Sequence, residues 1–194
     1  MKKLTRDDLY TLEEYSEIRS EFRNKIMAHK KNRQLEIGPN ATLYFEDRLV
    51  MHYQIQEILR AERIFEAEPI NEELEVYNAL VPDGNNWKAT FMIEFTDEEE
   101  RRIALTKMTG IESKLWLKVD GFNEIYPIAD EDLERENDIK TSAVHFLRFQ
   151  LTNEMIEALK LGSLLSAGIE HSNYNHIVNP VPENIRESLL SDLD

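Results

Sequence analysis

Three segments of the sequence place every second residue on an apolar face, and this period of two is the strongest constraint on the fold. In KATFMIEF (88–95) the apolar face runs from Ala89 to Phe95, and in KLWLKV (114–119) it runs from Leu115 to Val119. AVHFLRFQL (143–151) repeats the pattern. Because successive side chains of a strand point to opposite faces, these segments predict an antiparallel or mixed sheet that is covered on one side.

Helical patterns surround these strands, so the predicted class is α+β: a sheet covered by helices, with a long N-terminal helix. A chain of 194 residues fits one hydrophobic core, and we expect a single domain over 1–194. The expected helices cover about 6–33, 49–65, 70–81, 97–108, 152–160 and 183–192. The expected strands lie within 34–46, around a turn at Gly38-Pro39-Asn40, and within 88–170.

Two segments carry weaker patterns. The acidic run DEDLEREND (130–138) predicts a loop or a short solvated helix. HSNYNHIVNPVP (171–182) predicts an irregular loop after the last strand.

Composition excludes several classes of protein. The absence of cysteine excludes disulfides, thiol nucleophiles and a cysteine-ligated iron–sulfur cluster. No apolar run is long enough to cross a bilayer and the N-terminus lacks a signal-peptide pattern, so we expect a cytoplasmic protein without a membrane segment. A net charge of −15 disfavours general binding to nucleic acid. No common catalytic motif is present, and whether the protein is an enzyme stays open.

The charge is segregated along the chain. Residues 19–33 have a net charge of +5, which leaves −20 for the remainder. On the N-terminal helix, Arg19, Arg23 and Lys30 project along one border of the apolar stripe. This basic edge is able to bind a phosphate or carboxylate ligand, an acidic partner, or the protein's own carboxylates, Glu57 or Glu62 among them.

Glu62 lies on the apolar stripe of the helix expected at 49–65, which includes Ile55, Leu59 and Phe65. A buried carboxylate must be paired, protonated or bound to a metal, or else the helix turns away before it reaches Glu62. We favour an ion pair between Glu62 and the arginines of the N-terminal helix; the alternative is a polar pocket shared with His145 or His171. Gln54 and Glu57, one turn apart, are either solvated or in contact with a common ligand.

Histidines provide the other candidate positions. His145 lies in the core-facing row of its predicted strand, as a hydrogen-bonded core residue or as a ligand or proton carrier. His171 and His176, with Glu170 beside them, are ligand types suited to Zn²⁺ or Fe²⁺, although no third spaced ligand completes a motif. Tyr174 lies between these histidines.

The order of IGPNATLYFEDR, QIQEILRAE, NALVP, ATFMIEFTDEEER, TSAVHFLRF and EHSNY resembles a prokaryotic family of about this length, known as a domain of unknown function. The resemblance covers the chain from about Arg19 to its end. The positions that carry it are Arg23, Lys30, Gly38, Pro39, Glu46, Gln54, Glu57, Glu62, His145, Arg148, His171 and Tyr174. Genes of that family often lie beside those for rubrerythrin and an iron–sulfur oxidoreductase subunit.

The resemblance therefore implies an accessory or interaction protein of a redox system in oxidative stress, with rubrerythrin or the iron–sulfur subunit as partner. The alternative is a protein that binds a metal or a small anion, with or without catalysis. Its candidate site residues are Arg19, Arg23, Lys30, Gln54, Glu57, Glu62, His145, Arg148 and Tyr174, with Glu170, His171 and His176 as the candidate metal ligands.

Overall fold

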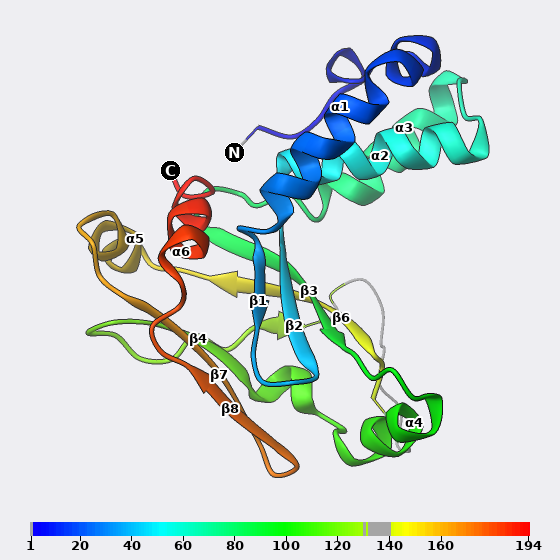
Figure 1. Cartoon of the computed structure of the whole chain (residues 1–194). Helices are drawn as coiled ribbons and strands as arrows, with labels where there is room; N and C mark the ends of the chain where they lie inside the picture. Colours follow the sequence, from blue (N-terminus) through cyan, green and yellow to red (C-terminus); the bar gives the residue numbers. More distant parts are fainter. Residues whose placement is uncertain (1, 130, 132–140) are drawn as a thin grey trace.

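Two antiparallel sheets form the centre of the protein, and helices surround them (Figure 1). The computed structural model describes residues 2–129, 131 and 141–194. Both the α+β class and the single domain with a long N-terminal helix are confirmed.

The larger sheet has the strand order β1-β2-β3-β6-β5. Its strands are β1 (Gln34–Glu36), β2 (Ala41–Glu46), β3 (Asn86–Ile93), β5 (Ile128–Ala129) and β6 (Val144–Gln150). The smaller sheet has the order β4-β7-β8, with β4 (Leu115–Val119), β7 (Leu165–His171) and β8 (Tyr174–Val178). All described strand pairs are antiparallel.

The apolar faces of the two sheets share one hydrophobic core. Leu43, Phe91 and Phe149 of the larger sheet belong to the same buried cluster as Leu117 and Ile169 of the smaller one. The period of two in the sequence is thus the signature of two packed sheets, each of which supplies apolar cover to the other.

Helices surround the sheets at several places. They are η1 (Arg6–Asp8), α1 (Leu12–Lys30), α2 (Arg48–Glu62), α3 (Ala67–Asn78), α4 (Glu98–Lys107), η2 (Ile111–Lys114), α5 (Asn153–Lys160) and α6 (Glu183–Leu190). Helices α1, α2 and α3 lie together at one end of the larger sheet (Figure 1) and bury two smaller apolar clusters of their own. None of the helices in the described part of the chain combines the length and the apolar character that a transmembrane span needs.

The N-terminal helix begins later than predicted. The capping box of Thr5 and Asp8 lies at the start of the short 3-10 helix η1. A second box, in which Thr11 accepts a hydrogen bond from the Glu14 backbone, starts α1. The prediction of a helix from residue 6 was therefore wrong by about two turns, because the first of two consecutive capping boxes was taken as the start.

The segment 171–182 is not an irregular loop. His171 of β7 pairs with Tyr174 of β8 across a two-residue turn, and Tyr174 to Val178 continue as a strand. Trp116 alternates with Leu115 and Leu117 and so lies on the other face of β4, yet it is buried, because its ring lies against Gly168, where a Cβ atom would come within 2.4 Å of it. The acidic run at 130–138 lies, apart from Glu131, outside the described residues.

Candidate functional site

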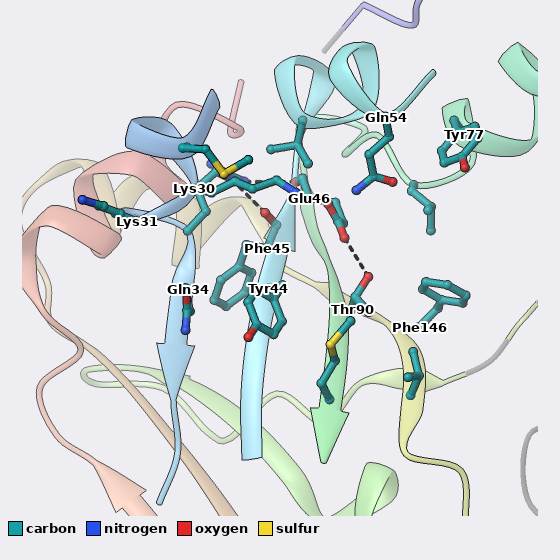
Figure 2. Close-up of a pocket in the computed structure, with 16 residues that line it drawn as sticks. Lys30, Lys31, Gln34, Tyr44, Phe45, Glu46, Gln54, Tyr77, Thr90 and Phe146 are labelled. Carbon is teal, nitrogen blue, oxygen red and sulfur yellow. Dashed lines mark hydrogen bonds between the residues drawn. The ribbon is translucent and has the colours of Figure 1, made fainter. Parts of the chain in front are cut away.

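A cleft of about 570 Å³ lies between the outer face of the larger sheet and the helices above it (Figure 2). Its roof comes from the C-terminal end of α1, the first turns of α2 and the segment that ends α3. Its lining residues are Met27, Lys30, Lys31, Arg33, Gln34, Tyr44, Phe45, Glu46, Val50, Gln54, Tyr77, Leu80, Thr90, Met92, Val144 and Phe146.

The floor of the cleft follows from strand register. Tyr44 of β2 pairs with Thr90 of β3, and Thr90 pairs in turn with Phe146 of β6. The next row of the floor is Met92 opposite Val144. Because these residues alternate with core residues, they all point to the outer face, where the sequence predicts a solvated surface. The helices instead turn this face into the floor of a cleft.

Glu46 contributes a buried carboxyl group to the lining of the cleft. Its residue is 5% exposed, and its carboxylate oxygen Oε1 accepts a 2.7 Å hydrogen bond from Thr90 Oγ1, the one hydrogen bond that other described residues donate to this side chain. Burial raises the pKa of Glu46, against the opposing effects of Thr90 and of the positive charge on Lys30. Figure 2 shows Gln54 and Lys30 on the roof side of this carboxylate.

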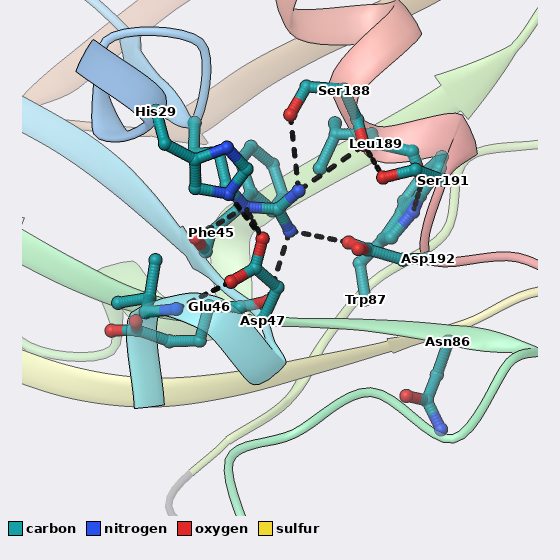
Figure 3. Close-up of polar contacts among 12 residues, drawn as sticks. His29, Phe45, Glu46, Asp47, Asn86, Trp87, Ser188, Leu189, Ser191 and Asp192 are labelled. Atoms are coloured by element: carbon teal, nitrogen blue, oxygen red, sulfur yellow. Dashed lines mark hydrogen bonds and ion pairs between the residues drawn. The ribbon is translucent and has the colours of Figure 1, made fainter. Parts of the chain in front are cut away.

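Arg33, at the edge of the cleft, is buried in a polar cluster, and Figure 3 shows its partners His29, Asp47 and Asp192. Its guanidinium donates to the carbonyl oxygens of Phe45 and Glu46, at 3.0 Å each, and to Asp192 Oδ2 at 2.5 Å. Asp47 Oδ2 lies 3.3 Å from Arg33 Nε and 2.5 Å from His29 Nε2. This cluster connects the end of α1, the start of α2 and the C-terminal segment.

The carboxylates of this cluster have opposite pKa shifts. Burial opposes ionisation of Asp47, but the hydrogen bond from His29 and the Arg33 charge prevail and lower the pKa of Asp47. Burial raises the pKa of Asp192 to about 6 despite its contact with Arg33. Asp192 Oδ1 is buried without a hydrogen-bond donor among the described residues.

The basic edge of α1 does not form one site. Arg19 makes a bidentate ion pair with Glu57 of α2, at 2.8 and 2.7 Å, and Tyr15 donates to the same carboxylate at 2.6 Å. The Arg19 hydrogen bond is the largest cause that lowers the pKa of Glu57. Arg23 lies farther along the same groove between α1 and α2, whereas Lys30 points into the cleft.

The predicted inward position of Glu62 is wrong. Helix α2 ends at Glu62, because Arg63 adopts a left-handed conformation with φ of 56°. Glu62 is exposed, and Phe65, which defines the far end of the predicted stripe, is 73% exposed. An ion pair between α1 and α2 does exist, and its acid is Glu57, the other carboxylate considered for the basic edge.

His145 is fully buried in the interior behind β3. Its Nε2 lies 2.9 Å from Thr141 Oγ1, 3.1 Å from the Ser142 carbonyl oxygen and 3.7 Å from Glu112 Oε2. It is a hydrogen-bonded core histidine on the face of β6 opposite to the cleft, whereas its neighbours Val144 and Phe146 line the cleft.

The β7–β8 hairpin positions the remaining candidates separately from His145. His171 Nε2 lies 3.2 Å from the Thr109 carbonyl oxygen, and the ring of His176 packs on Tyr174 with centroids 4.6 Å apart. Glu170 alternates with His171 along β7 and therefore points to the opposite face. Within the described ranges, no three His, Asp or Glu side chains converge as a metal site.

Tyr174 holds the β1–β2 turn. Its hydroxyl donates to the Ile37 carbonyl oxygen at 2.8 Å and accepts from the Asn40 amide at 3.0 Å. Gly38, with a φ of 78°, makes room for the side chains of Tyr174 and His176, since a Cβ atom there would come within 2.6 Å of both. Arg148 lies on the outer face of β6 and pairs with Glu131 at 2.8 Å.

The cleft therefore unites Lys30 and Gln54 with residues that sequence reasoning did not select as a site. Glu46, Thr90 and Phe146 are the principal omissions. The available signal was Glu46 at the end of ATLYFE, in phase with Thr42 and Tyr44 on the non-core face of its strand. That signal does not reveal that helices which precede and follow this strand in the chain cover its non-core face.

The fold and cleft define an α+β protein in which two packed antiparallel sheets have helices over one end of the larger sheet. The chain belongs to the family described as protein of unknown function (DUF3501), whose model matches residues 3–193, and the resemblance to a family of unknown function is thereby confirmed. A crystal structure of a novel protein of unknown function from Burkholderia pseudomallei is similar, with 46% identity, full coverage of both chains and a TM-score of 0.92. No curated protein matches the chain.

Proposed function

We propose that the protein binds a small amphipathic molecule in the cleft, with an apolar or aromatic body on the sheet and a polar end at Glu46. The observation that carries this proposal is the Glu46 carboxyl group, which lines the cleft, is 5% exposed and has Thr90 as its one described hydrogen-bond donor. A carboxyl group has capacity for further hydrogen bonds, and burial without them is costly. A ligand group that donates to Glu46 would complete its coordination.

The shape and lining of the cleft support a small organic ligand. Its volume of about 570 Å³ lies within the usual range of ligand pockets. Tyr44, Tyr77 and Phe146 provide aromatic walls, and Met92 provides an adaptable apolar surface. Such pockets are mostly apolar with a few polar groups that orient the ligand.

The polar end of the cleft favours a group that both donates and accepts hydrogen bonds. Glu46 offers an acceptor, and Lys30 offers a donor on the roof side of the cleft (Figure 2). The Gln54 amide provides one of each. A carboxamide or a ring with adjacent donor and acceptor atoms matches this set better than a simple anion, because an anion would face the Glu46 carboxyl group.

Ligand-observed NMR with benzamide as the probe tests the proposal. We expect saturation transfer from the wild-type protein, with a Kd of about 1–10 mM for so small a molecule. Val144→Trp adds bulk to the cleft floor and should abolish the signal, whereas the matched control Ile177→Trp, on the exposed face of β8, should retain it. N,N-Dimethylbenzamide, which lacks the donor, should bind several-fold more weakly. Equal benzamide signals from both tryptophan variants would reject the cleft as the binding site.

The role beside rubrerythrin or an iron–sulfur subunit stays a prediction that rests on the family resemblance alone. A metal site at Glu170, His171 and His176 likewise stays a prediction, and the opposed faces of Glu170 and His171 do not favour it.

A further inference from the structure

A second polar depression lies on the groove between α1 and α2, away from the cleft. Its lining consists of Ser16, Arg19, Ser20, Arg23, Asn24 and Arg60. The α1 members recur at steps of three and four residues, so they form one face of that helix, and Arg60 joins them from α2. Among the residues that the structure describes, this lining has three guanidinium groups and no carboxylate.

Two of these arginines pair with no acid among the described residues. Arg19 is neutralised by its bidentate pair with Glu57. Arg23 and Arg60 are exposed, and among the described residues neither has a hydrogen bond or an ion pair. In a chain with a net charge of −15, this leaves two unpaired cations together while carboxylates outnumber bases elsewhere.

The Arg19–Glu57 pair gives the depression a fixed base. Tyr15, which is fully buried, donates to Glu57, so the carboxylate and its arginine are held against the helix interface. The Arg60 charge also contributes to lowering the pKa of Glu57, which places Arg60 near the same pair. Arg60 therefore lies beside an ordered ion pair, and Arg23 lines the same depression.

We propose that this depression binds a phosphate group, held by the guanidinium groups of Arg23 and Arg60, with the Ser20 hydroxyl and the Asn24 amide as additional donors. Guanidinium groups offer paired N–H donors that match the oxygens of phosphate, and hydroxyl and amide donors complement them. This site uses the basic edge of α1 but replaces Lys30, which lies in the cleft, by Arg60. It is independent of the function proposed for the cleft.

Isothermal titration calorimetry of the full chain with inorganic phosphate at low ionic strength tests the site. We expect saturable binding that weakens at least tenfold in the double variant Arg23→Gln/Arg60→Gln. The matched control Arg101→Gln/Arg102→Gln removes two exposed arginines from α4 and should change the Kd by less than twofold. Thermal melts should be unchanged in the site variant, because neither Arg23 nor Arg60 has a described polar contact to lose.

Two further titrants define the source of the phosphate. AMP binding tighter than phosphate, with the same loss in the double variant, would assign the phosphate group of a larger molecule, and equal affinities would assign the free ion. Succinate tests selectivity. If succinate binds as tightly as phosphate with the same dependence on Arg23 and Arg60, or if the α4 control loses as much affinity as the site variant, the proposal is overturned.

Discussion

Glu46 and Asp47 are consecutive acids at the end of β2, yet their carboxyl groups differ in how many protein partners they have. The Asp47 side chain meets His29 and Arg33, and its other oxygen accepts from the Val50 amide at the start of α2. The Glu46 side chain points the other way, into the cleft, where Thr90 is its one described hydrogen-bond donor. Because strand residues alternate between faces, one step along the chain separates a structural carboxylate from one that faces open space.

The contrast shows how the protein distributes the cost of buried charge. At Arg33, the chain supplies the partners itself: three carbonyl oxygens, a serine hydroxyl and two aspartates surround one guanidinium. At Glu46, burial raises the pKa and protein groups meet only part of its hydrogen-bonding capacity. A satisfied polar cluster fixes how helices join the sheet, whereas a partly satisfied group beside a cavity favours a bound molecule.

Arg33→Met should have the largest effect, because it leaves two buried aspartates and three carbonyl oxygens without their shared donor. We expect the free energy of unfolding to fall by about 3–5 kcal/mol, as for the loss of one partner of a buried ion pair. Urea unfolding followed by circular dichroism measures the change.

The matched control is Arg102→Met. Arg102 also pairs with an acid, Glu99, but both side chains are more than 60% exposed. We expect a loss within about 0.5 kcal/mol, since exposed ion pairs contribute little. Similar losses in the two variants would show that the Arg33 cluster is not a structural centre.

Asp192→Asn tests the carboxyl group of that cluster whose second oxygen has no hydrogen-bond donor among the described residues. The pKa of Asp192 rises from its usual 3.8 to about 6 in the folded protein. The folded state therefore binds a proton more tightly than the unfolded state, and this carboxyl group contributes stability below pH 4 that is lost as pH rises to about 6. Relative to the variant, the wild type should lose roughly 2–3 kcal/mol of unfolding free energy across that interval.

The measurement is urea unfolding of both proteins at several pH values from 4 to 7.5. Other titrating groups are common to the two proteins and largely cancel in the difference. A wild type that gains stability over the variant as pH rises would mean that the contact with Arg33 outweighs burial at Asp192, so that Asp192 resembles Asp47.

The period of two was sufficient to predict the fold class and the main strands of both sheets. It could not separate the sheets, because core residues such as Leu117 and Leu147 have the same alternation whichever sheet they enter. The strand Tyr174–Val178 was missed because its polar residues resemble a loop, although Tyr174, His176 and Val178 alternate toward one face. The end of α2 depends on the left-handed Arg63, which is not a residue that usually signals a helix end.

The site was only partly predictable. Lys30 and Gln54 were among the candidates because they are polar residues on amphipathic helices. Glu46 was not, because its environment depends on contacts between β2 and helices that precede and follow it in the chain. For the same reason, the sequence leaves both Glu57 and Glu62 open as partners of the α1 arginines and favours Glu62, whereas the helix crossing selects Glu57.

Glu46→Gln should have the smallest effect on stability and a sign opposite to that of its neighbour's substitution. Because burial raises the pKa of Glu46 above its usual 4.5, its contribution to stability is greatest below that pH and declines as pH rises through the folded pKa. A neutral glutamine retains an oxygen acceptor for Thr90 and avoids the buried charge, so at pH 7.5 the variant should be as stable as the wild type or more stable by about 1 kcal/mol.

Asp47→Asn should instead destabilise the protein at that pH, because the pKa of Asp47 is lowered and its ionised form is the one that His29 and Arg33 stabilise. Urea unfolding of the two variants measures both signs, and a loss at Glu46 equal to that at Asp47 would assign both acids to one structural network and remove the basis for a ligand at Glu46.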